Sequence, residues 1–128
     1  MKLVFTAREI GPLAQAHIDL ANLAGDKEVA IGVALLARSQ RARVSGVDLD
    51  DSPVSQSAAQ HIRELGNQAQ CLFNQALELG RPRIALGVAI LAQSCNSPLS
   101  LPGWMAREIE ERVQRSVQSA DPRRRLLR

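Results

Sequence analysis

Aromatic side chains are almost absent from this chain of 128 residues, which has no Tyr, two Phe and one Trp. A core without aromatic rings must be built from Leu, Ile, Val and Ala, which suits packed helices better than strands, where aromatic residues are enriched. The shortage also leaves few rings on which exposed nucleic-acid bases could stack. We therefore expect a helical protein, and any contact with nucleic acid should be to its phosphates.

Cysteines and long apolar runs are also scarce. Cys71 and Cys95 lack CxxC spacing, so we expect free thiols in the core rather than a disulfide or a metal site. The longest apolar run, 29–37, is far shorter than the roughly 20 residues that cross a bilayer, and no signal peptide is recognisable. These features predict a cytoplasmic protein without a membrane partner.

The net charge of +3 comes from the last eight residues. Segment 121–128 carries four Arg and one Asp, which leaves 12 basic and 12 acidic side chains in the rest of the chain. We expect residues 1–120 to form a single helical domain and residues 121–128 to be a frayed basic tail.

The chain contains an internal duplication. Residues 8–39 return without a gap as residues 63–94, with fourteen identities among 32 aligned positions at a constant offset of 55. A repeated unit is one supersecondary element that needs a neighbour to bury its apolar face. We therefore predict an all-α fold, a five-helix bundle built from two tandem α-hairpins at about 8–39 and 63–94 plus a C-terminal covering helix.

Capping residues, glycines and prolines indicate where the helices begin and end. The T-x-x-E pattern of Thr6 and Glu9 predicts the start of the first helix. Pro12 either kinks this helix or marks its true beginning, and Gly25 is expected to end it. The remaining helices are expected over about 26–43, 52–79, 82–94 and 101–119, with turn-rich segments between them.

The segment 69–82, AQCLFNQALELGRP, resembles the second helix of a tetratricopeptide repeat, with Ala69, Phe73, Ala76 and Pro82 near the usual offsets. The preceding helix lacks the Trp, Leu-Gly and Tyr positions of that family. The period of 55 residues also departs from the family period of about 34. The resemblance therefore implies a helical hairpin, but not membership of the tetratricopeptide-repeat family.

One apolar stripe at helical spacing is common to both copies. It consists of the pairs Ile10/Leu65, Ala14/Ala69, Ile18/Phe73, Ala21/Ala76 and Ala24/Leu79. The first copy has an additional stripe of Leu13, Leu20 and Leu23, which we expect the C-terminal helix or a partner chain to cover. Trp104, at the start of that helix, is expected to anchor it.

The second helix of each copy is apolar on every side, with the sequences VAIGVALLA and IALGVAILA, and should lie in the middle of the assembly. Gly32 and Gly87 occupy equivalent places in these helices, near the small residues Ala34 and Ala89. We expect the two helices to cross at the glycines about a pseudo-twofold axis, or each Gly to relieve crowding within its own hairpin. Because two such helices are hard to cover in a short chain, a homodimer is also expected.

No catalytic, cofactor or metal motif is recognisable in the sequence. His17 aligns with Leu72 and is expected in the core, whereas His61 and Glu64 lack the further ligands that a metal needs. The acidic cluster of Asp48, Asp50 and Asp51 is typical of a solvated linker with a helix cap. The sequence therefore predicts that the protein is not an enzyme and has no cofactor.

Two functions remain open. The duplication, the missing catalytic group and the surplus of apolar residues favour a non-catalytic protein–protein interaction module, a small adaptor or regulator. The alternative is a nucleic-acid-binding accessory protein that contacts phosphates through clustered arginines. These are Arg38, Arg41, Arg43, Arg81 and Arg83, with Arg123, Arg124 and Arg125 in the tail. An Arg near the C-terminus of a helix can also have a purely structural role, because its charge interacts favourably with the negative end of the helix dipole.

Overall fold

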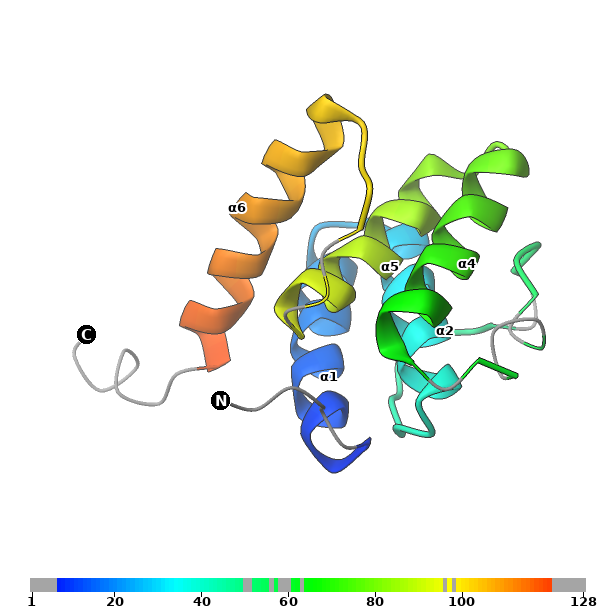
Figure 1. Cartoon of the computed structure of the whole chain (residues 1–128). Coiled ribbons are helices and arrows are strands. Elements are labelled where there is room, and N and C mark those ends of the chain that lie inside the picture. Colours follow the sequence, from blue (N-terminus) through cyan, green and yellow to red (C-terminus); the bar gives the residue numbers. More distant parts are fainter. Residues whose placement is uncertain are drawn as a thin grey trace.

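The computed structural model describes residues 7–49, 52–55, 57, 61–62, 64–95, 97 and 99–120. Its helices are α1 (Ala7–Leu23), α2 (Lys27–Ser39), α4 (Leu65–Glu78), α5 (Pro82–Ser94) and α6 (Gly103–Ala120), and the described residues form no strand. In Figure 1, α4 and α6 lie on opposite sides of the central pair α2 and α5. The predicted all-α class is confirmed.

The ends of α1 and α4 follow the predicted glycine signal. Gly25 and Gly80 have φ angles of +74° and +71°, which glycine adopts without steric strain. One residue later, the amides of Asp26 and Arg81 each donate to a carbonyl five residues back, at 2.8 Å. This Schellman pattern satisfies carbonyls that the helix end leaves open. The helix α1 also continues on the N-terminal side of Pro12, whereas Thr6 lies outside the described residues.

Two predicted helices are shorter than the sequence suggests. α2 ends at Ser39 and not near Arg43, because Arg41 takes a left-handed conformation with φ of +64°. α4 begins at Leu65 and not near Ser52. Val54, which was expected inside this helix, is only 3% exposed and packs against the core.

The helices α2 and α5 form the centre of the molecule. Nine of the thirteen residues of each helix are buried, and the two helices pack against each other and against α1 and α4. A single chain therefore covers both all-apolar helices. The argument that led to the expected homodimer no longer holds.

The two central helices are in backbone contact at their glycines. A Cβ atom placed on Gly32 would overlap the carbonyl oxygen of Ile84 and lie 2.9 Å from the Cα atom of Gly87. A Cβ atom on Gly87 would overlap the carbonyl oxygen of Val29, the residue 55 positions before Ile84. Only glycine permits this approach at either position.

Polar contacts repeat with the same offset of 55 residues. Asp26 pairs with Arg83, and the equivalent residues Arg81 and Glu28 pair at 3.6 Å. Such reciprocal contacts are the signature of a twofold relationship. The arrangement of α2 and α5 is thus approximately symmetric, although the signs of these charges are exchanged.

The repeat extends beyond the stretch recognised in the sequence. The side chain of Gln15 bonds to the backbone of Ser45 through both its amide nitrogen and its oxygen, at 3.0 and 2.9 Å. The equivalent Gln70 accepts from the amide of Ser100 at 3.3 Å. Both copies therefore bind the segment that follows their second helix, up to Ser45 and Ser100.

Helix α6 packs on α5 and α1 through Met105 and Ile109, which are 0% and 1% exposed. Trp104 is 61% exposed, so the expectation that it anchors this helix is wrong. Leu23 is 85% exposed and is not covered by α6, whereas Leu13 is partly buried against the core.

The common apolar stripe is buried as predicted along most of its length. Its last pair, Ala24 and Leu79, is exposed because both residues lie beyond the ends of α1 and α4. Leu65 is partly buried at the first turn of α4.

Candidate functional site

A hollow on the surface gathers three arginines from the first copy. It has a volume of about 480 Å³ and lies between the beginning of α1 and the segment after α2. Its lining residues are Arg8, Gly11, Pro12, Gln15, Arg41, Ala42 and Arg43. We call this feature the arginine hollow. Two of its arginines, Arg41 and Arg43, were predicted from the sequence as phosphate contacts, and Arg8 was not.

The segment that carries Arg41 and Arg43 is held against α1. Gln15 forms its two bonds to Ser45 from one side, and Gly11 lies close enough that a Cβ atom there would be 3.7 Å from the carbonyl oxygen of Arg43. Gln15 was missed as a site residue. Because Gln15/Gln70 and Ser45/Ser100 are both identical pairs at the offset of 55, extending the repeat by six residues would have indicated the contact.

Arg41 occupies a backbone conformation that disfavours its side chain. A non-glycine residue in the left-handed region is uncommon and costs about 1–2 kcal/mol. The turn is stabilised by the amide of Ala42, which donates to the carbonyl of Ala37 at 2.9 Å. The fold therefore directs the chain sharply away from α2 at a residue where Gly or Asn would be more stable.

The arginines of this end have no acidic partners. Arg8, Arg38, Arg41 and Arg43 are all exposed, and none of them is ion-paired with a carboxylate among the described residues. Their guanidinium groups are thus available to an external anion.

Arg81 and Arg83, by contrast, already have carboxylate partners. Arg81 pairs with Glu28, and Arg83 contacts both Asp26 and Glu108, the latter at 3.1 Å. Hydrogen bonding to Asp26 raises the pKa of Arg83 above its ordinary value. Arg81 and Arg83, which were predicted as phosphate contacts, thus form ion pairs within the protein.

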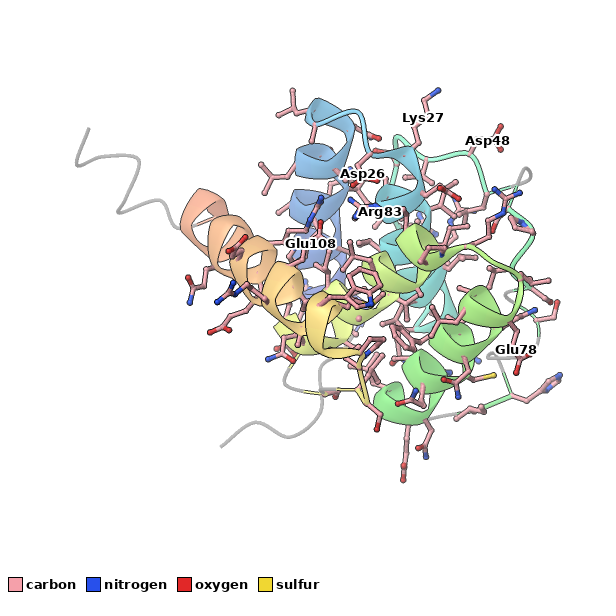
Figure 2. The ribbon with its side chains drawn as sticks, turned by 90° about the horizontal axis from the view of Figure 1, so that it is seen from above. Asp26, Lys27, Asp48, Glu78, Arg83 and Glu108 are labelled. Carbon is pink, nitrogen blue, oxygen red and sulfur yellow. The ribbon has the colours of Figure 1, made fainter. Side chains whose placement is uncertain are left out.

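The ion pairs around Arg83 form a cluster that connects α6 to the ends of α2 and α5. Arg112 of α6 reaches Asp26 at 3.0 Å and Glu108 at 3.5 Å, so two arginines alternate with two carboxylates. Figure 2 shows Asp26, Arg83 and Glu108 grouped where α6 passes the ends of α2 and α5. The side chains are 15–36% exposed, so solvent weakens the cluster only in part.

Three of the predicted arginines cannot be placed. Arg123, Arg124 and Arg125 lie outside the described residues.

The predicted crossing and interface residues have different environments. Gly32, Gly87, Ala34 and Ala89 are buried in the central pair. Leu20 borders a small pocket of about 40 Å³ that Arg112 also lines. Trp104 faces solvent.

His17 lies in the core, as expected. It is 4% exposed, and its Nε2 atom is 2.7 Å from the hydroxyl of Ser94, the last residue of α5. Burial lowers the pKa of His17 from 6.5 to about 4. The imidazole is therefore neutral at physiological pH, and transfer of a proton to it would be unfavourable there.

Both cysteines are free thiols, but only Cys95 lies in the core as expected, since Cys71 is partly exposed. Cys95 is buried, and burial raises its pKa to about 11. A thiol that stays protonated is a poor nucleophile and a poor metal ligand.

The other polar motifs remain separate. His61 is exposed, and the nearby Glu64 accepts a hydrogen bond from Asn67 at 2.7 Å. No group of three His, Cys, Asp or Glu side chains suited to a metal ion occurs in the part of the chain that the structure describes.

Comparison with known proteins provides no family for this chain. No family model, no curated protein and no solved structure matches it. None of the described helices combines the length and apolar character needed to cross a membrane.

Proposed function

We propose that this protein is a non-catalytic helical binding module whose partner is a nucleic acid held by its phosphates. The observation that supports this proposal is the arginine hollow, in which Arg8, Arg41 and Arg43 gather without a carboxylate partner among the described residues. Guanidinium groups bind phosphate oxygens with two parallel hydrogen bonds, which makes Arg well suited to this ligand.

The structure changes the balance between the two functions that the sequence left open. A protein partner was favoured because apolar residues exceeded the needs of one hairpin. That surplus is now accounted for inside the α2–α5 pair. The arginines near the end of α2 could instead have had a purely structural role, but they form no ion pair with any carboxylate in the part of the chain that the structure describes.

Binding should be to the backbone and not to particular bases. The chain has only three aromatic residues, so stacking on exposed bases would contribute little. The proposal therefore concerns an accessory protein with weak sequence preference, in which affinity is dominated by charge.

Oligonucleotide titration at two salt concentrations tests this proposal. If each of the four arginine charges releases about one counterion from the nucleic acid, we expect affinity for random duplex DNA to fall about 100-fold between about 50 and 200 mM salt. Changing Arg8, Arg38, Arg41 and Arg43 together to Gln should abolish most of that dependence. Fluorescence anisotropy with a labelled duplex and a labelled single strand provides the measurement.

Two variants with equal loss of charge are compared for position. One changes Arg41 and Arg43 to Gln, and the control changes Lys27 and Arg107 to Gln, because both of these side chains are exposed and lie outside the arginine hollow. This control should retain the salt slope of the unaltered protein. Deleting residues 121–128 separates the basic tail from the hollow. Binding that disappears on deletion, but survives the four Gln substitutions, would contradict the proposal.

A protein partner is the second candidate, supported by the exposure of Trp104. Tryptophan is enriched among the residues that dominate binding energy at interfaces, and this one is 61% exposed. We expect Trp104→Ala to leave the free energy of unfolding within about 0.5 kcal/mol of its original value. A partner captured from the native host should be lost with this variant. Equal capture by both proteins would remove Trp104 from consideration.

A further inference from the structure

The two copies of the repeat carry different charges where the arginine hollow lies. The residues 55 positions after Arg41 and Arg43 are Asn96 and Pro98, which are uncharged. The supporting contact is nevertheless retained in the second copy, where Gln70 binds the backbone of Ser100. The scaffold is thus common to both copies, whereas the added positive charge belongs to the first.

Arg41 is also the residue least suited to its own backbone. Asn tolerates the left-handed conformation better than other residues with a side chain, and Asn is what the second copy has at the equivalent position. Arg41 at φ of +64° therefore sacrifices some stability. Strained residues of this kind persist where the side chain has a use, often at ligand sites.

The hollow is organised before any ligand arrives. Arg8 belongs to the first turn of α1, and the Gln15–Ser45 bonds fix the segment carrying Arg41 and Arg43 beside that helix. A preorganised site loses less conformational entropy on binding than flexible side chains on an open surface.

We propose that the arginine hollow is a seat for one phosphate group of a nucleic-acid backbone, contacted by Arg8, Arg41 and Arg43. This inference rests on the proposed function but is narrower, because it assigns a single phosphate to one place. Arg38, at the end of α2 and outside the lining of the hollow, contributes general attraction.

The first probe is inorganic phosphate, which is titrated into the full chain while the amide chemical shifts are recorded. We expect saturable shifts at Gly11 and at residues 41–43, without comparable shifts near Lys27 or Arg107. Chemical-shift changes of equal size around exposed basic residues throughout the protein would show that phosphate is attracted without a specific site. That result would overturn the proposed phosphate site in the arginine hollow.

Arg41→Gly provides a test in which two effects have opposite signs. Glycine relieves the left-handed backbone, so the melting temperature should rise by about 4 °C. The same change removes a guanidinium, so the phosphate shifts should weaken and the salt slope for an oligonucleotide should fall by about 1. Loss of binding in a more stable protein cannot result from unfolding. Arg107→Gln is the charge-matched control and should alter neither phosphate shifts nor slope.

The remaining outcomes distinguish the seat from the wider proposal. Oligonucleotide binding that is unchanged in Arg41→Gly would overturn the seat and leave nucleic-acid binding in place. An oligonucleotide with neutral methylphosphonate linkages should not bind, and equal affinity for it would overturn both. A phosphoserine peptide that binds at the hollow, without binding of any oligonucleotide, would overturn the assignment to nucleic acid.

Discussion

Replacing Gly32 with Ala should lower the free energy of unfolding by about 3 kcal/mol or more, which is large for the addition of one methyl group. The added Cβ would overlap the carbonyl oxygen of Ile84 and lie 2.8 Å from the amide nitrogen of Val88. Both are backbone atoms of a packed helix and cannot rotate away. α2 and α5 must therefore separate, which loosens the core along both helices.

The intrinsic preference of helices acts in the opposite direction, since Ala is favoured over Gly by about 1 kcal/mol. Gly66→Ala is the matched control, because Gly66 lies in α4 and its new Cβ atom would be 4.0 Å from its nearest neighbour, the Cβ atom of Ser97. This variant should be as stable as the original protein or slightly more so. Chemical denaturation monitored by circular dichroism measures both, and a Gly32→Ala protein of unchanged stability would contradict the crossing.

The reciprocal contacts extend this prediction to Gly87. Its Cβ would lie 2.9 Å from the amide nitrogen of Val33, so Gly87→Ala should be destabilising to a similar degree. Once one substitution has separated the helices, the second meets less resistance. The double variant should thus lose less stability than the sum of the two single changes.

Acidification should destabilise the protein through His17. The pKa of the buried imidazole is about 4, against 6.5 in the unfolded chain, so the unfolded state binds more protons between these values. Stability is therefore present above pH 6.5 and is lost as the pH falls toward 4. At about 1.4 kcal/mol per pKa unit, the full loss from this residue is about 3 kcal/mol.

His17→Leu isolates this effect from the titration of carboxylates. The second copy already has Leu72 at the equivalent position, and this Leu is fully buried. In the variant, Ser94 can still donate to the carbonyl of Ile90, which it contacts at 2.9 Å. We expect the difference in unfolding free energy between the two proteins to widen in favour of the variant from pH 7 to 4. A difference that stays constant over this range would exclude His17 as the cause.

Several helix boundaries were predictable because they depend on local chemistry. Gly25 and Gly80 end their helices through a backbone conformation that glycine adopts freely, and Pro82 begins α5 where its missing amide is harmless. The start of α4 was not predictable in this way. Burial of Val54 requires the chain to turn toward the core, and no local signal in the sequence reports that contact.

The candidate site was predictable only in part. Arg41 and Arg43 are close in the sequence and form a visible cluster, whereas Arg8 joins them only because α1 lies beside the segment after α2. Trp104 illustrates the opposite error. A large apolar residue at the start of an amphipathic helix suggested an anchor, yet Trp104 is exposed while Met105 and Ile109 of the same helix are buried.

The sequence by itself determined the helical class, the duplicated unit and the central position of the two all-apolar helices. These properties follow from the periodicity of apolar residues, which acts along one helix at a time. The tertiary structure decided which arginines are free to bind an anion. Asp26 neutralises Arg83 across 57 positions in the chain, while Arg8, Arg41 and Arg43 meet no described carboxylate. Charge is compensated through space, so the spacing of residues along the chain cannot reveal it.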